Sequence, residues 1–244
     1  LIHSFDDMNT KTFKGLPGIF ADSMLDKFGN QLIDLYMVGR NIPPDNVTAL
    51  DRLLYVGTRG MGALEYHPAA ELGEANNAET ALDIHLLAEL ADRLTSRDRA
   101  KRDDLLNSEN RSAALRLIRV GFSAGGARSK ALVARAPGGA LCDGGVDHGP
   151  DFTYWIVKFD TEFNSDRDSR DPKGMPKIEY IYSRVAANCE NDMPRTDFII
   201  DGMEFHFLIE RFDRVPDKER TNKLHYGSWA GLAHADRDPV GTQS

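Results

Sequence analysis

The dipeptide Asp201-Gly202 lies between two apolar runs, residues 197–200 and 203–211. An Asp-Gly step in this setting is a strong short-range signal of a β-hairpin, because glycine readily adopts the positive φ that tight turns require. The chain is therefore expected to contain an antiparallel pair of strands in its last third.

Neighbouring segments add strands and a helix to this hairpin. Residues 153–159 (TYWIVKF) are rich in aromatic and β-branched side chains, which predicts a strand. Residues 117–122 (LIRVGF) are predicted as a strand that feeds a glycine-rich turn, and residues 131–136 as the strand that returns from it. Residues 178–189 carry apolar side chains at i, i+3, i+4, i+7, i+8 and i+11, which predicts an amphipathic helix. The second half is thus expected to hold three to five antiparallel strands with one inserted helix.

Helical periodicity dominates the first half. The apolar spacing predicts helices over residues 20–37, with a break near Gly29, and over residues 48–54 and 77–94. Residues 95–112 are dense in charged and polar side chains, so they are predicted to be a solvated connection between two units.

Length and composition fit this division. The chain has 244 residues, of which 41% are hydrophobic and 28% charged, enough for one large globular domain or two small ones. We expect an α+β fold with a small N-terminal α/β subdomain (residues 1–95), a connection (96–112) and an antiparallel-sheet lobe (113–244).

Charge and cysteine content narrow the functional classes. The formal net charge is −8, which argues against autonomous nucleic-acid binding, because phosphate contacts need a surplus of Lys and Arg. Cys142 and Cys189 have no metal-site spacing and are expected to be free thiols in a reducing cytoplasm. No apolar segment is long enough to cross a membrane, and no signal peptide is recognisable near the start.

Residues 121–130 (GFSAGGARSK) form the first candidate site. Glycines let backbone N–H groups approach phosphate oxygens, and the final lysine, Lys130, supplies positive charge. The segment matches neither the P-loop pattern of nucleotide triphosphatases nor the dinucleotide-binding pattern. A tight β-turn with incidental glycines explains it equally well on motif grounds alone.

Lys158 and Glu179 form the second candidate. Lys158 ends a largely apolar strand, where it either reaches out to solvent at the sheet edge or pairs with a carboxylate and contacts nucleotide phosphates. Glu179, at the start of the following helix, is either that carboxylate or a favourable charge in the first helical turn. His206, His225 and His234 lack metal-ligand spacing, so no metal site is predicted.

The third candidate is the segment at residues 209–214 (IERFDR), where the hairpin strand runs into a loop. Its backbone groups can meet an adenine edge, although a simple strand end with surface ion pairs is the alternative. A glycine-rich turn, a strand lysine, a helix with an early glutamate and then a hairpin is also the order of parts in a kinase nucleotide lobe.

These segments resemble successive motifs of the HipA family, serine/threonine kinases that act as toxins of type II toxin–antitoxin modules. The matching segments are spread over nearly the whole chain and are residues 13–28 (FKGLPGIFADSMLDKF), 50–65 (LDRLLYVGTRGMGALE), 120–130 (VGFSAGGARSK), 155–160 (WIVKFD), 178–180 (IEY), 207–214 (FLIERFDR) and 232–236 (LAHAD).

The resemblance implies a role for individual residues. Ser123 matches the serine of the family's phosphate loop, which is a site of inhibitory autophosphorylation, and Lys158 matches the strand lysine that contacts phosphate. Asp213 would lie beside the ribose. The resemblance further implies a loop around the ATP phosphates made by Gly125, Gly126, Ala127, Arg128, Ser129 and Lys130, and a segment whose backbone meets adenine made by Glu210, Arg211 and Phe212. Ser129 and Leu25 depart from the residues common in the family.

The resemblance does not extend to a catalytic lobe. The family's catalytic Asp, its Asn and its Mg²⁺-binding Asp lie in a C-terminal helical lobe, and no H-x-x-D-x-x-x-x-N pattern occurs in these 244 residues. We therefore expect catalytic residues and metal ligands to lie outside this chain, and the chain to be inactive by itself. The alternative is a non-catalytic module that docks on a kinase chain or an antitoxin.

The cofactors and partners that the resemblance implies are ATP with Mg²⁺, a HipB-like antitoxin, and a protein substrate such as an aminoacyl-tRNA synthetase. DNA contact is expected only through the antitoxin, because the chain itself is acidic.

Overall fold

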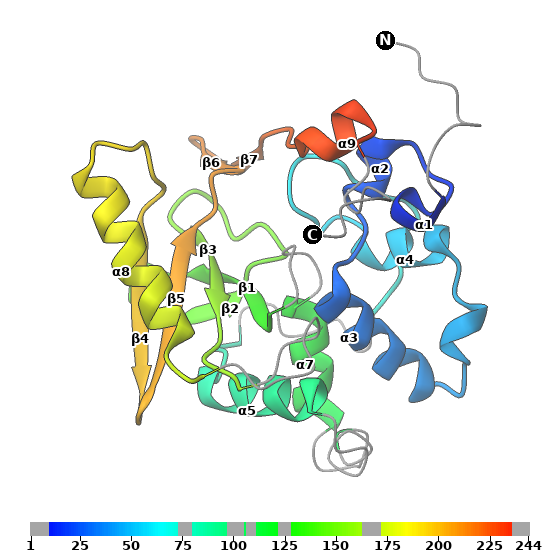
Figure 1. Cartoon of the computed structure of the whole chain (residues 1–244), viewed down its shortest axis with the longest axis horizontal. Coiled ribbons are helices and arrows are strands. Elements are labelled where there is room, and N and C mark those ends of the chain that lie inside the picture. Colours follow the sequence, from blue (N-terminus) through cyan, green and yellow to red (C-terminus); the bar gives the residue numbers. More distant parts are fainter. Residues whose placement is uncertain are drawn as a thin grey trace, which may run out of the picture.

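The computed structural model describes residues 10–72, 80–96, 105, 111–121, 128–162 and 172–235. Helices dominate the first half and strands the second (Figure 1). The helices are α1 (Thr10–Phe13), α2 (Gly18–Ala21), α3 (Lys27–Val38), the 3-10 helix η2 (Pro44–Asn46), α4 (Ala49–Val56), α5 (Ile84–Thr95), α7 (Arg111–Gly121), α8 (Met175–Asn188) and α9 (Trp229–Ala233). The strands are β1 (Lys130–Arg135), β2 (Leu141–Asp143), β3 (Thr153–Lys158), β4 (Thr196–Asp201), β5 (Glu204–Glu210), β6 (Arg214–Pro216) and β7 (Thr221–Lys223).

The central element is a five-stranded sheet in the order β2-β1-β3-β5-β4, with every neighbouring pair antiparallel. The predicted hairpin is confirmed as β4–β5. Its turn is one residue later than the dipeptide suggested, because Asp201 pairs with Glu204 and leaves Gly202 and Met203 as the turn. Gly202 has φ +58°, which is why glycine is needed there. The short strands β6 and β7 form a separate hairpin.

The two faces of the sheet are covered differently. Trp155, Val157 and Leu208 point into a core shared with α3, α5 and α7, and each is at most 4% exposed. Burying side chains of this size stabilises the fold by about 1.5–3 kcal/mol each. The opposite face receives α8, which packs on β4 and β5 (Figure 1).

The strand predicted over residues 117–122 is wrong, because residues 111–121 form the helix α7. Ala114, Leu117, Ile118 and Gly121 are all buried, and their spacing of three and four residues is the period of a helix. A β-carbon on Gly121 would lie 2.5 Å from the Leu32 side chain, so the helix packs tightly against α3. The β-branched residues at 118 and 120 suggested a strand only because the window was too short.

Two other helix predictions need smaller corrections. The break expected near Gly29 falls at residues 22–26, and Gly29 itself is buried in α3. The helix expected over residues 77–94 begins at Ile84, after Asp83 caps it by accepting a hydrogen bond from the Leu86 N–H at 3.0 Å. Residues 77–79 lie outside the described part of the chain.

A single cluster of buried apolar residues runs from α3 and α5 through α7 to the inner face of the sheet. Leu105, inside the predicted connection, is 1% exposed and belongs to this cluster. The division of the chain into residues 1–95, 96–112 and 113–244 stays a prediction. Among the described helices, none has both the length and the apolar character needed to cross a membrane.

Candidate functional site

The predicted pairing of Lys158 is present in the structure. Lys158 ends β3, and its Nζ donates to Glu179 Oε2 of α8 on the outer face of the sheet. Both side chains are about one-third exposed, so the ion pair can be reached from solvent. Glu179 lies beyond the first turn of α8, because the helix begins at Met175. Of the alternatives left open by the sequence, the structure therefore selects the strand–helix ion pair.

A cavity of about 850 Å³ opens beside Lys158. The sheet contributes Lys130, Ile156 and Lys158, and the segment after β5 contributes Phe212. The opposite wall comes from the first helices and their connections, which supply the polar and charged side chains Asp22, Ser23, Asp26, Asn30 and Arg52. Its volume lies within the range of small-molecule sites, about 300–1,000 Å³.

Lys130 also lines this cavity, but its amine is engaged. Nζ lies 2.5 Å from Asp26 Oδ2, and the two side chains are 3% and 11% exposed. The other oxygen of Asp26 caps α3 by accepting a hydrogen bond from the Gly29 N–H at 2.6 Å. The amine further sits 6.0 Å from the centre of the Phe28 ring. Asp26 thus joins the start of β1 to the start of α3.

The rest of the predicted phosphate loop is described only in part. Ser123, Gly125, Gly126 and Ala127 lie outside the described residues. Arg128 is partly exposed, whereas Ser129 is buried and its hydroxyl lies 2.7 Å from that of Thr161.

In the predicted adenine segment, one side chain is exposed to the cavity and the others form ion pairs within the chain. Phe212 is 51% exposed, lines the cavity and packs edge-on against Tyr226 at a ring separation of 5.4 Å. Glu210 forms a two-pronged ion pair with Arg195, with both N–O distances at 2.5 Å. Phe212 is therefore the side chain of this segment that a ligand in the cavity can touch.

Arg211 and Asp213 belong to a buried cluster beside this segment. Arg211 donates to both carboxylate oxygens of Asp213, at 3.0 and 2.8 Å, and Arg214 adds a third contact at 2.6 Å. Both side chains of the Arg211–Asp213 pair are fully buried. The predicted contact of Asp213 with a ribose stays a prediction, and in this arrangement its carboxylate holds the fold together.

The same cluster gives a role to the glycines at residues 57–62. The Gly62 N–H donates to Asp213 at 2.7 Å, and the Gly60 carbonyl accepts from both Arg211 and Arg214. Gly62 has φ +78°, a backbone conformation that favours glycine. The three closely spaced glycines were the sequence signal of this contact, but nothing local indicated its partner.

Burial and neighbouring charges shift the pKa values of Asp213 and Arg214. Burial alone would raise the pKa of Asp213, but the hydrogen bonds and charges of Arg211 and Arg214 outweigh it and hold that pKa below its usual value. Burial, together with the nearby charge of Arg211, lowers the pKa of Arg214 to about 10. At neutral pH Asp213 is therefore ionised, and Arg214 keeps its positive charge.

Asp201, Glu204 and His206 place potential metal-ligand atoms within 4.8 Å of one another. The Asp160 N–H donates to Nδ1 of His206 at 3.1 Å, so the neutral ring carries its proton on Nε2, the atom that faces the carboxylates. A metal-bound histidine needs the opposite arrangement, with a free lone pair toward the metal. Burial also lowers the pKa of His206. These residues do not fit a metal ion.

Comparison with known proteins identifies part of the chain. Residues 122–242 match the family model described as the HipA-like C-terminal domain. The match covers β1 to α9, including the sheet, Lys158, Glu179 and the segment at residues 210–213. No curated protein matches the chain.

Proposed function

We propose that this chain, which contains a HipA-like C-terminal domain, provides the ATP-binding lobe of a serine/threonine kinase of the HipA toxin type. The observation that carries the proposal is the ion pair between Lys158 and Glu179. It joins a lysine on the third strand of an antiparallel sheet to a glutamate on the next helix, as protein kinases do at their nucleotide site.

The cavity beside this ion pair suits ATP. Ile156 and Phe212 offer apolar surface to a base, and the backbone of Arg211 and Phe212 continues directly from the end of β5. Lys158 supplies a positive charge for phosphate oxygens, with residues 125–130 as the proposed phosphate loop and Ser123 as the proposed autophosphorylation site. ATP, when bound, brings the phosphoryl group that is transferred, and the Mg²⁺ ligands are proposed to lie outside these 244 residues.

The geometry assigns Lys130 and Lys158 different parts in this site. Lys158 is accessible and needs no rearrangement to meet a phosphate, apart from sharing its amine with Glu179. Lys130 is held by Asp26, so it contributes directly only if that ion pair opens. In the arrangement described, Lys130 acts by fixing the first residue of β1 next to the loop.

Partners follow from the family and from charge. We include a HipB-like antitoxin and a protein substrate such as an aminoacyl-tRNA synthetase in the proposal, with DNA reached only through the antitoxin. The net charge of −8 is the reason that direct DNA contact is not proposed.

The chain lacks the kinase catalytic-loop pattern. It is therefore expected to bind ATP without transferring phosphate by itself.

Nucleotide binding is the decisive test. A non-hydrolysable ATP analogue at about 100 times its Kd should stabilise the chain by about 2.7 kcal/mol, or roughly 5–10 °C in melting temperature. Lys158→Ala should weaken binding by about 10- to 100-fold, because a charge-assisted contact is lost. Lys218→Ala is the matched control, since this exposed lysine lies on the β6–β7 turn away from the cavity.

One observation favours a second function, a non-catalytic module that docks on a kinase chain or antitoxin. The carboxylate of Asp213 and the amine of Lys130, both predicted to meet the nucleotide, are engaged in buried ion pairs. If the analogue produces no stabilisation in the wild type, the ATP proposal fails and the docking function takes its place. Equal binding by wild type and Lys158→Ala would likewise contradict the role given to this lysine.

A further inference from the structure

Helix α8 exposes the apolar stripe that the sequence predicted. Ile178, Ile181, Tyr182 and Val185 fall at i, i+3, i+4 and i+7, a pattern typical of a face that packs against other structure. Yet their exposed fractions are 45%, 50%, 70% and 52%. The stripe therefore faces solvent, which is unusual for four large side chains in one row.

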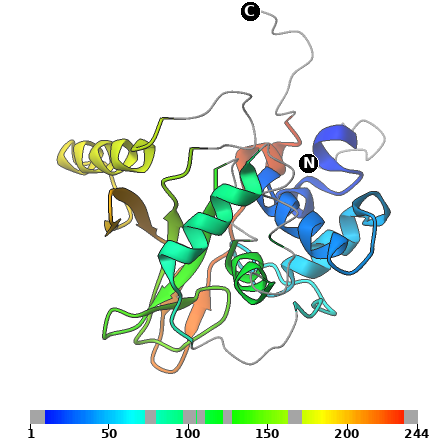
Figure 2. The same cartoon turned by 90° about the horizontal axis from the view of Figure 1, so that it is seen from below.

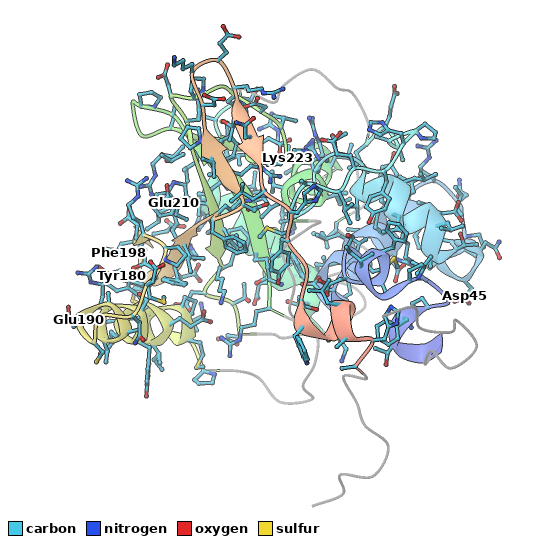
Figure 3. The ribbon with its side chains drawn as sticks, turned by 90° about the horizontal axis from the view of Figure 1, so that it is seen from above. Asp45, Tyr180, Glu190, Phe198, Glu210 and Lys223 are labelled. Carbon is cyan, nitrogen blue, oxygen red and sulfur yellow. The ribbon has the colours of Figure 1, made fainter. Side chains whose placement is uncertain are left out.

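The helix is already anchored through its other face. Pro176 and Ser183 are buried, and Tyr180 packs on Phe198 at a ring separation of 5.1 Å (Figure 3). Glu179 adds the ion pair to Lys158. Figure 2 shows α8 at the periphery of the molecule, well away from the N-terminal helices. The described chain thus leaves about half or more of the stripe's side-chain surface uncovered.

Two cations border the stripe. At 3.6 residues per turn the four apolar side chains span roughly 100° of the helix surface, and Lys177 and Arg184 both fall along the same edge of that arc. Both are exposed, and neither has an ion-pair partner in the part of the chain that the structure describes. Glu190, an exposed acidic residue nearby, lies past the end of α8 (Figure 3).

We propose that this face of α8 is a docking surface for an amphipathic helix of another protein, one that carries acidic side chains along one flank. The i, i+3, i+4, i+7 stripe matches the ridge of a packed helix, and the single-sided cations select an acidic flank. This inference does not depend on nucleotide binding.

A second copy of this chain fits the surface less well. Antiparallel packing of α8 on α8 about a two-fold axis brings the same flank of each helix together, because such an interface is self-complementary. Lys177 and Arg184 of one copy would then lie on the same side as those of the other. Like charges in that position repel each other, whereas acidic side chains on a partner helix would pair with these cations.

Two designed peptides test the proposal. Both are helical with leucines at i, i+3, i+4 and i+7, and one carries glutamates along the flank where the other carries lysines. The wild-type chain should bind the acidic peptide at least about tenfold more tightly in low salt, and the preference should shrink as salt is added. Fluorescence anisotropy of the labelled peptides measures both affinities.

Two variants separate charge from apolar contact. Lys177→Glu with Arg184→Glu should reverse the preference toward the basic peptide, and Ile181→Asp with Val185→Asp should abolish binding of either one. All four side chains are exposed, so circular dichroism and the response to the ATP analogue should match the wild type. Equal affinity for both peptides, no binding up to about 1 mM, or self-association that is lost in the aspartate variant would each overturn the proposal.

Discussion

Lys130 and Lys158 lie directly opposite each other on β1 and β3, yet their surroundings differ sharply. The amine of Lys130 is enclosed between Asp26 and Phe28, and its side chain is 3% exposed. The amine of Lys158 meets Glu179 at a partly open surface, and its side chain is 33% exposed. Both were assigned to phosphate binding from the sequence. Strand position therefore brings the two lysines to one site, while burial decides which of them is available to a ligand.

Burial also determines how much stability is lost when each ion pair is broken. A buried charge that loses its partner costs several kcal/mol, because it has been removed from water without compensation. An accessible pair returns to water when broken and costs at most about 1 kcal/mol. Breaking a buried pair should therefore destabilise this fold more than breaking an accessible one.

Asp213→Asn should produce the largest loss. The substitution leaves Arg211 and Arg214 buried around a neutral amide, so we expect the free energy of unfolding to fall by about 3–5 kcal/mol at pH 7. Urea denaturation followed by circular dichroism measures the loss. A change below about 1 kcal/mol would show that burial does not set the value of this cluster.

The loss of stability in Asp213→Asn should depend on pH. The pKa of Asp213 is lower in the folded chain than in the unfolded one, so its stabilisation is complete above the unfolded value of about 3.9. It disappears as the pH falls through the lower folded pKa. The difference between wild type and Asp213→Asn should therefore be constant near neutrality and shrink only below about pH 4.

Lys130→Met should lower the free energy of unfolding by about 3 kcal/mol. It keeps the volume of the side chain but leaves the nearly buried carboxylate of Asp26 without its ion-pair partner. The double variant Lys130→Met with Asp26→Asn should recover much of that loss, since no uncompensated charge remains. Chemical denaturation of the wild type, both single variants and the double variant forms the complete cycle. Strictly additive losses would contradict a direct pairing.

Local patterns were sufficient to predict much of the sheet. The Asp201-Gly202 turn, the aromatic and β-branched run of β3 and the apolar period of α8 each carry their own signal within a few residues. The Lys158–Glu179 pair was foreseen as one of two alternatives, because strand and helix follow each other closely along the chain.

Contacts between distant segments could not be predicted in the same way. Lys130 and Asp26 are 104 residues apart, and Gly62 and Asp213 are 151 apart. The period of α8 correctly predicted an apolar stripe but could not say that the stripe faces solvent. At α7, local β-branched residues misled the prediction because the helical period becomes visible only over a full ten residues.

Lys158→Ala should barely change stability. Its ion pair with Glu179 is one-third exposed, so we expect a loss of less than about 1 kcal/mol, although binding of the ATP analogue should drop. Measuring unfolding and binding on the same preparation separates the two effects. A loss as large as that of Lys130→Met would remove the contrast between the two lysines.

The exposed ion pair between His85 and Asp201 should have the smallest effect on stability, and NMR spectroscopy tests it. His85 Nδ1 lies 2.6 Å from Asp201, and the histidine side chain is 69% exposed. The hydrogen bond and charge of Asp201 raise the pKa of His85, so any stabilisation is present below the usual value of about 6.5 and is lost as the pH rises through the higher folded pKa. An NMR titration should find the His85 pKa above that usual value in the wild type and return it there in Asp201→Asn. Because both groups are solvated once they separate, His85→Ala should leave the melting temperature nearly unchanged, and a large drop would mean that accessible pairs also hold this fold together.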